Sequence, residues 1–291
     1  MPARNRTQER GIPMTDAASP TEPVLLTEDL GPVRRLTMNR PGALNALSGE
    51  LIAALSAAFA AGAEDPTIRV MILRGAGRAF CSGYDLNEDA GAEPMDAVGW
   101  HRELEGSARH MLEIFDNPKP IIAQVHSYCL AGGCDLMMIC DLCVCSDDAR
   151  FGEPEIRFGS GVVTMVMPWV LGVRKAKELL FTGEDRISAE EALRIGLVNR
   201  VVPRDELDDA TLALAEEIAK NDPFAVSMQK RAINRAWEAA GFREAIASNV
   251  EIDALIEAAD LPEREAFRKI TLEQGLKKAI EWRDARFRSA R

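Results

Sequence analysis

Two acidic residues that flank a glycine-rich turn have the types and spacing that suit catalysis. Asp135 follows the turn 130–134, which joins the apolar run 121–125 to an apolar helical pattern, and Glu155 comes 20 residues later. A strand that turns on glycines into the start of a helix presents unpaired backbone N–H groups at the positive end of the helix dipole. Two carboxylates beside such amides predict acid–base chemistry next to a developing negative charge.

The same pattern also has ordinary explanations when it is taken alone. An aspartate in the first turn of a helix complements the helix dipole, and paired glycines mark tight turns or close packing. A second segment, RGAGRAFCSGYDL at residues 74–86, also places glycines directly after an apolar strand pattern, 70–73. Two such segments in one chain favour a site over two unrelated turns.

Several ordered segments resemble one known group of enzymes. RGAGRAFCSGYDL resembles the oxyanion-hole segment of the crotonase superfamily, which is the enoyl-CoA hydratase/isomerase family. AGGCDL at 131–136, FGEPEI at 151–156 and NRPGALNAL at 39–47 resemble three further motifs of that family. The stretch 179–203, LLFTGEDRISAEEALRIGLVNRVVP, keeps the family's order, and the resemblance covers roughly residues 22–287. On these motifs the chain is identified as a member of the superfamily.

The resemblance implies an α/β fold and its organisation. We expect a disordered tail at 1–21, a crotonase-like spiral core of ββα units at 22–203, and a C-terminal helical region at 204–291 that forms trimers. The implied assembly is a homotrimer or a hexamer built as a dimer of trimers. The alternation of helical and strand patterns is consistent with such a core.

The residues themselves predict most of the elements. Runs at 23–28 and 33–38 form a hairpin that turns at Gly31 and Pro32, and Ser48 caps a helix that reaches about residue 62. Strands at 121–125 and 142–146 enclose the glycine turn, and residues 87–100 are expected to form a mobile loop. Ser188 starts a capping box, and Gly196 ends that helix. Further helices are expected at 100–115 and from positions 205, 223, 241 and 262.

Matching the family's motifs residue by residue implies specific roles. The N–H groups of Tyr84 and Gly132 would bind the thioester oxygen of an acyl-CoA substrate, and Asp135 and Glu155 would be the two catalytic carboxylates. No separate cofactor and no metal are expected, because coenzyme A is part of the substrate. The residues expected to bind the substrate are Gly42, Ala43, Leu44, Ser82, Gly83, Asp85, Leu86 and Gly133.

Two departures from the family pattern leave the reaction open. Hydratases commonly carry Glu at the position of Asp135, and a glycine-rich run where this chain has Val163, whose bulk would crowd a water site. A 2-enoyl-CoA hydratase is the leading interpretation. An enoyl-CoA isomerase that uses Glu155 alone, another crotonase-type reaction such as C–C bond hydrolysis, and a non-catalytic CoA-binding protein remain alternatives. The family's C-terminal CoA contacts align with Ala279 and Trp282, which leaves the phosphate contacts unassigned.

Two further polar residues lie close to these motifs. Glu153, two residues before Glu155, is expected to be solvated, because Pro154 would spoil a shared orientation on an extended segment. His126 precedes the glycine turn, and we expect it to have a packed or hydrogen-bonded structural role.

Composition excludes other classes of function. A net charge of −11 without a basic run argues against nucleic-acid binding. No apolar stretch approaches the roughly 20 residues of a membrane helix, and the first 20 residues lack the apolar centre of a secretory signal. Cys143 and Cys145 alternate on a strand pattern and point to one face, so all six cysteines are interpreted as buried thiols of a reduced, cytoplasmic protein.

Overall fold

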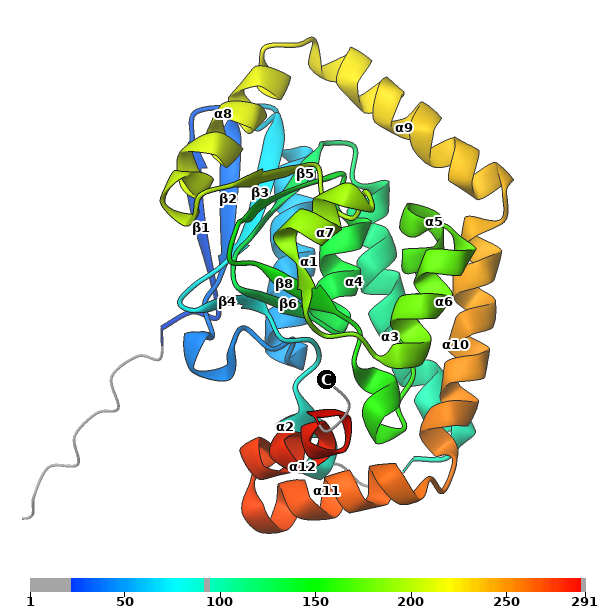
Figure 1. Ribbon diagram of the computed structural model, residues 1–291. Helices are drawn as coiled ribbons and strands as arrows, with labels where there is room; N and C mark the ends of the chain where they lie inside the picture. Colours follow the sequence, from blue (N-terminus) through cyan, green and yellow to red (C-terminus); the bar gives the residue numbers. More distant parts are fainter. Residues whose placement is uncertain (1–21, 92–94, 289–291) are drawn as a thin grey trace, which may run out of the picture.

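A computed structural model describes residues 22–91 and 95–288 and contains two sheets surrounded by helices (Figure 1). The predicted tail 1–21 and residues 92–94 of the predicted loop lie outside the described residues. The strands are β1 Leu25–Leu30, β2 Val33–Met38, β3 Val70–Gly75, β4 Ala79–Cys81, β5 Ile121–Val125, β6 Tyr128–Leu130, β7 Leu142–Ser146, β8 Arg150–Gly152, β9 Ile187–Ser188 and β10 Arg200–Val202. The α-helices are α1 Gly49–Glu64, α2 Leu86–Gly91, α3 Ala97–Asp116, α4 Gly132–Ile139, α5 Met167–Leu171, α6 Val173–Thr182, α7 Ala189–Arg194, α8 Leu207–Ala219, α9 Pro223–Ala239, α10 Phe242–Ala258, α11 Pro262–Gln274 and α12 Leu276–Arg288. Three short 3₁₀ helices are η1 Pro41–Ala43, η2 Glu155–Phe158 and η3 Arg204–Glu206.

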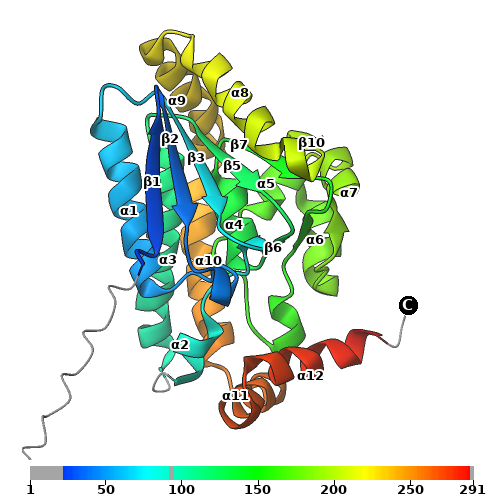
Figure 2. The same ribbon diagram turned by 90° about the vertical axis from the view of Figure 1, so that its left-hand side faces the viewer.

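The larger sheet separates two apolar layers. Its order is β1-β2-β3-β5-β7-β10, and all neighbours are parallel except the hairpin pair β1 and β2 (Figure 2). Because successive side chains alternate between faces, Leu73 and Ala123 enter the main core with α1, α3 and α4, whereas Ile72 and Ile122 pack beneath α8. This two-sided burial accounts for the continuous apolar runs of β3 and β5.

A smaller second sheet repeats the connectivity of the first. Strands β3, β5 and β7 of the large sheet are each followed by a short strand, β4, β6 or β8, and these three pair in parallel. The register places Cys81 opposite Cys129 and Leu130 opposite Gly152, so the three strands end close together. The chain therefore winds as a spiral of ββα units, as the resemblance implied.

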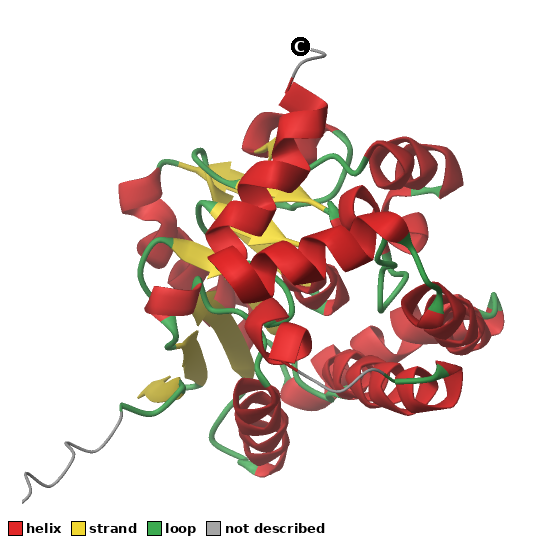
Figure 3. Ribbon diagram, turned by 90° about the horizontal axis from the view of Figure 1, so that it is seen from below, coloured by secondary structure: helices red, strands yellow, loops and turns green. Residues whose placement is uncertain are grey.

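Helices near the C-terminus enclose the core at one end. Helix α10 runs beside α3, and the rings of Phe115, Trp169, Trp237 and Phe242 pack together and join α3, α5, α9 and α10. Helices α11 and α12 cross the lower end of the molecule and contact η2 (Figure 3). Within the described ranges, no helix is long and apolar enough to cross a membrane.

Most of the predicted elements are confirmed, with two errors. The hairpin, the Ser48 cap of α1, and strands β5 and β7 agree with the prediction. The predicted loop 87–100 was wrong in part, because Leu86–Gly91 forms α2 and α3 already begins at Ala97. The three-residue strands of the second sheet were missed, since so few residues show no period. A boundary at 203/204 stays a prediction, and α8 beyond it packs on the large sheet.

We predict that Gly152→Ala destabilises the protein. A Cβ atom at Gly152 would lie 2.0 Å from the Glu184 carbonyl oxygen, and this backbone contact has no flexible side chain that could yield. Overpacking of this kind costs about 1–3 kcal/mol, measured as a lower midpoint of urea unfolding. Gly49→Ala at the start of α1 is the matched control, because a Cβ there meets nothing within 4 Å. Equal midpoints for the two variants would contradict the packing described for β8.

Candidate active site

Three successive turns of the spiral bring the predicted residues together. Strands β4, β6 and β8 end side by side and lead into residues 82–84, 131–132 and 153–155, respectively. A Cβ atom at Gly83 would lie 2.5 Å from Ala131 Cβ and 3.2 Å from the Gly132 amide nitrogen. The first two turns are therefore in contact, and Gly83, at φ +97°, has a conformation that favours glycine.

Two backbone N–H groups at this contact are free. A parallel bridge between Leu47 and Tyr84 uses the N–H groups of Leu47 and Asp85, and leaves that of Tyr84 unpaired. Gly132 is the first residue of α4, where an N–H has no partner within the helix. Neither amide donates to any group in the described part of the chain.

The preceding residue, Ala131, carries the strain that this arrangement requires. Its φ of 55° and ψ of −140° lie in a region that is usual only for glycine. Its N–H donates to the Gly152 carbonyl at 2.8 Å, which continues the pairing of β6 with β8. The third turn thus holds Ala131 in this conformation, immediately before the free amide of Gly132.

The Tyr84 side chain packs against the helix start. A Cβ atom at Gly132 would lie 2.5 Å from Tyr84 Cε2, so the ring occupies the space that any larger residue at 132 would need. Burial and the negative charge of Asp135 raise the pKa of the Tyr84 hydroxyl above its usual value. The Tyr84 hydroxyl therefore remains neutral, and it has no geometric hydrogen-bond partner among the described residues.

Asp135 lies in the first turn of α4 and is buried. Its side chain is 1% exposed, and Oδ2 accepts a hydrogen bond from the Thr164 N–H at 3.1 Å. Oδ1 has no partner among the described residues. Burial, and then the charge of Glu155, raise the pKa of Asp135 well above that of a free aspartate.

Glu155 is the first residue of η2 and is 8% exposed. Burial raises its pKa to about 7, although its own backbone N–H, a hydrogen bond with Glu153 and the charge of Arg283 favour the ionised form. Its Oε2 has no hydrogen-bond partner in the described ranges. The structure therefore brings two buried carboxyl groups, each with an unused oxygen, beside the two free amides.

The C-terminal helices hold the Glu155 turn in place. Phe158 of η2 stacks on Phe267 of α11 with ring centroids 4.8 Å apart, and Arg286 of α12 donates to the Arg157 carbonyl. Ala279 is fully buried in this cluster. It therefore packs on η2 of its own chain, and the CoA contact that its aligned position suggested is not available to it.

The expectation that Glu153 is solvated was wrong. Its side chain is 2% exposed, because its N–H donates to the Glu184 carbonyl at 3.1 Å and extends the pairing of β8 beyond Gly152. The side chain lies in the interior, close enough to Glu155 for each carboxyl group to affect the pKa of the other.

Sequence reasoning missed Asp253 of α10, a further buried carboxyl group. It is 2% exposed, and neither carboxyl oxygen has a hydrogen-bond partner among the described residues. Burial and the charge of Glu257 raise its pKa to about 7, and its charge in turn raises the pKa values of Asp135 and Glu155. Its position three residues after the buried Val250 on the apolar face of a helix was the available signal.

The segments expected to bind coenzyme A are also adjacent. The Ser82 N–H donates to the Leu44 carbonyl at 3.1 Å, which joins η1 to the turn after β4. Leu86 begins α2 directly beyond that turn. Gly133, in contrast, packs against Cys81, where a Cβ atom would lie 2.7 Å from the carbonyl oxygen. The predicted contacts of Gly42, Ala43, Leu44, Ser82, Gly83, Asp85, Leu86 and Gly133 with substrate stay predictions.

An ion pair joins the two segments that are expected to bind coenzyme A. Arg40 Nη2 lies 2.8 Å from Asp85 Oδ2. Burial acts to raise the pKa of Asp85, but hydrogen bonds from Arg40 and from Asn87 outweigh it and hold the pKa below the usual value. Asp85 is therefore charged and paired. This state suits it to connect the two segments rather than to transfer protons.

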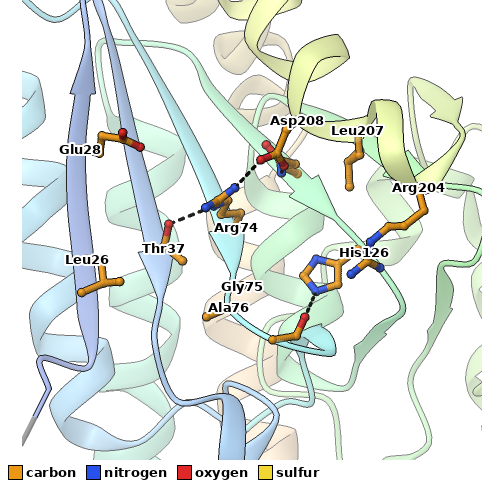
Figure 4. A pocket seen from close by; sticks show the side chains of 12 residues that line it. Leu26, Glu28, Thr37, Arg74, Gly75, Ala76, His126, Arg204, Leu207 and Asp208 are labelled. Carbon is orange, nitrogen blue, oxygen red and sulfur yellow. Dashed lines mark hydrogen bonds and ion pairs between the residues drawn. The ribbon is translucent and has the colours of Figure 1, made fainter.

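His126 and the cysteines have the structural roles expected of them. His126 Nε2 lies 3.0 Å from the Gly77 carbonyl oxygen, and burial lowers the pKa of its imidazole. It lines a cavity of about 670 Å³ with Arg74 and Asp208, on the α8 side of the large sheet, and Asp135 is not among the residues that line this cavity (Figure 4). All six cysteines are free and buried, and no metal-binding group occurs in the described residues.

Comparison with known proteins gives a consistent result. The family model described as "Enoyl-CoA hydratase/isomerase" matches residues 30–288. A crystal structure of an enoyl-CoA hydratase/isomerase from Xanthobacter autotrophicus Py2 is 43% identical, with a TM-score of 0.88, and the match covers 90% of this chain and 98% of that one. A short-chain-enoyl-CoA hydratase of Clostridium acetobutylicum is 34% identical over 79% of this chain and 92% of its own length. A carnitinyl-CoA dehydratase of Salmonella paratyphi A is 38% identical over 69% and 76%.

We predict that Asp135→Asn stabilises the protein increasingly as the pH rises. The pKa of Asp135 is higher in the folded chain than in the unfolded one, so the folded state binds more protons between the two values and loses stability as the pH rises through them. Asparagine does not ionise, and its side-chain oxygen retains the bond from Thr164. Thermal unfolding at pH 5 and pH 8 measures the difference. Asp147→Asn, at an exposed aspartate, is the control. A smaller gain at pH 8 than at pH 5 would contradict the burial argument.

Proposed function

Because the chain belongs to the enoyl-CoA hydratase/isomerase family, we propose that it adds water across the double bond of a 2-enoyl-CoA thioester. One observation carries this proposal. Asp135 and Glu155 are both buried beside the free amides, and each keeps one oxygen without a partner, Oδ1 and Oε2. Two such acceptors suit a water molecule held between them.

The amides of Tyr84 and Gly132 supply the electrostatic part of the reaction. Both would donate to the thioester oxygen, which becomes negative when an enolate forms next to it. Backbone donors are fixed before the reaction and do not titrate, so no reorganisation is needed as the charge develops. Loss of one such donor typically costs about 3 kcal/mol of transition-state stabilisation.

The carboxyl groups supply the proton transfers. Ionised Glu155 takes a proton from the water as the water oxygen bonds to C3. The protonated Glu155 then gives that proton to C2 of the enolate and is ionised again. One water thus provides both added groups. Asp135, which burial favours in its neutral form, keeps the water oriented. The pKa of Glu155 near 7 leaves a large share of the base ionised at neutral pH.

Substrate recognition and assembly complete the proposal. The wall formed by 42–44 and 82–86 is the proposed site for coenzyme A, which enters as part of the substrate, so no separate cofactor is required. Exposed apolar side chains on α9 and α10, among them Phe224, Ile233 and Leu255, suit a homotrimer or a hexamer. We place the protein in the cytoplasm on the strength of its free thiols.

One observation supports a second candidate for the function, an enoyl-CoA isomerase. Val163 is half-buried and adjoins Thr164, whose N–H binds Asp135. A branched side chain there would restrict the water between the carboxyl groups. Shifting a double bond needs only one base to move a proton between carbons, and Glu155 suffices for that.

Isotope labelling separates the two candidates. We expect mass spectrometry of 2-enoyl-CoA incubated with the protein in ¹⁸O-labelled water to show labelled oxygen in the acyl chain. Interconversion of 2-enoyl-CoA and 3-enoyl-CoA without uptake of oxygen would establish the isomerase instead. Unchanged substrates, with CoA still bound, would contradict both candidates.

Substitutions test the roles of the carboxyl groups. We predict that Glu155→Gln lowers kcat/KM for hydration by at least about 10²-fold, because general acid–base catalysis contributes on that order. Asp135→Asn should also lower it while leaving CoA binding intact. Glu273→Gln, at an exposed position of α11, is the control. Hydration that survives Glu155→Gln at the wild-type rate would remove Glu155 from the mechanism.

A further inference from the structure

Glu153 is a buried acidic residue beside the proposed site that the reaction above does not use. It is 2% exposed, and neither Oε1 nor Oε2 accepts a hydrogen bond from an N–H or hydroxyl group of the described residues. In the described part of the chain, neither Glu153 nor Glu155 forms an ion pair with a lysine or an arginine. A buried carboxylate without a partner is costly, so this residue needs a chemical explanation.

The carboxyl groups of Glu153 and Glu155 lie within hydrogen-bonding reach of each other, and no N–H or hydroxyl group of the described residues donates to either oxygen of Glu153. An ionised carboxylate only accepts hydrogen bonds, so a bond between two carboxyl groups requires that one of them keeps its proton. Like charges at such a short distance in a buried site also prevent both groups from ionising. The pair therefore holds at least one proton while the hydrogen bond exists.

The surroundings determine which member keeps the proton. Glu155 starts η2, where its own backbone N–H binds the carboxylate, and Arg283 of α12 lies close enough to favour its ionised form. Glu153 has neither advantage, since its backbone N–H is used by Glu184. The other groups that act on Glu153, Asp135 and Cys134 of α4, disfavour its ionisation, and Asp253 of α10 disfavours that of Glu155.

We propose that Glu153 is a positioning residue which stays protonated and donates a hydrogen bond to the Glu155 carboxylate, so that the pair shares one proton and Glu155 is the member that acts as base. The donated bond would orient Glu155 and favour its ionised form. One oxygen of Glu155, Oε2, would then remain directed at the substrate water. This inference rests on the proposed function only for its catalytic consequence.

The Glu153–Glu155 pair determines the acidic limb of the pH profile of kcat/KM, which is the pH range in which the rate rises as Glu155 ionises. Glu155 must be ionised to accept a proton, so kcat/KM should rise with pH through about 7, the pKa of Glu155. The bond from Glu153 favours the ionised form and lowers that pKa. If Glu153 is a protonated donor, its removal should move the acidic limb to higher pH. If Glu153 were instead ionised, removal of its negative charge would move the limb to lower pH.

Two substitutions at 153 distinguish these cases. Glu153→Gln keeps the shape and offers an N–H donor, so its acidic limb should coincide with that of the wild type. Glu153→Leu removes the donor, and its limb should move up by about one pH unit or more, because a hydrogen bond to a charged group is worth that much. The rate of Glu153→Leu should recover at high pH, which a purely structural defect would not produce.

Three results would overturn the proposal. A limb that moves to lower pH in Glu153→Gln would mean that Glu153 is ionised. An equal loss of rate at every pH in both variants, with the limb unmoved, would leave Glu153 a packing role only. A limb that stays in place in a folded Glu153→Leu would show that no bond from Glu153 acts on Glu155. If Glu153→Leu does not fold, Glu153→Gln alone decides between the first two.

A measurement without substrate separates this inference from the proposed function. We expect the infrared spectrum of the wild type at pH 8 to contain the carbonyl band of a protonated carboxyl group that Glu153→Gln loses. Absence of that difference would contradict proton sharing even in an active hydratase. Its presence in a protein that hydrates no enoyl-CoA would uphold the shared proton and reject the proposed function instead.

Discussion

The parallel pairing of three short strands is the constraint on which the proposed site depends. Strands β4, β6 and β8 have only three residues each, and their register places Cys81, Leu130 and Gly152 at neighbouring ends. The chain leaves each strand into a different part of the site. The bond from the Ala131 N–H to Gly152 extends this pairing by one step and holds Ala131 in its strained conformation. Without that register, the amides of Tyr84 and Gly132 would have no reason to lie together.

Burial of carboxyl groups is the second feature of the design, and it opposes stability. Asp135, Glu153 and Asp253 lie in the interior without a paired cation among the described residues, and burial raises the pKa of each. Helices α11 and α12 contribute to this burial by packing on η2. A low local dielectric strengthens every interaction with the reacting groups, and it makes ionisation of neighbouring acids mutually exclusive. In the proposed reaction, the same packing that costs stability separates the carboxyl groups into acids and a base.

Prediction from the sequence succeeded where one residue determines a local structure. Ser48 at a helix start, the turn at Gly31 and the apolar run of β5 each follow from short-range rules, and the structure confirms them. The positions of Asp135 and Glu155 came from ordered motifs. The burial of Glu153 and of Asp253 could not be predicted from motifs, because it depends on which elements pack around these residues. Three-residue strands also escaped, since a period cannot be recognised in so few residues.

The central claim is that the two free amides polarise the thioester of a bound enoyl-CoA. The most direct test is the carbonyl stretching frequency of a 2-enoyl-CoA labelled with ¹³C at the thioester carbon, bound to Glu155→Gln so that turnover is prevented. Two hydrogen bonds to the oxygen weaken the C=O bond, so the account predicts a lower frequency in the complex than in water. Gly132→Ala, which forces the Tyr84 ring and the helix start apart, should reverse part of that shift. A bound substrate whose carbonyl frequency equals that in water would contradict the account.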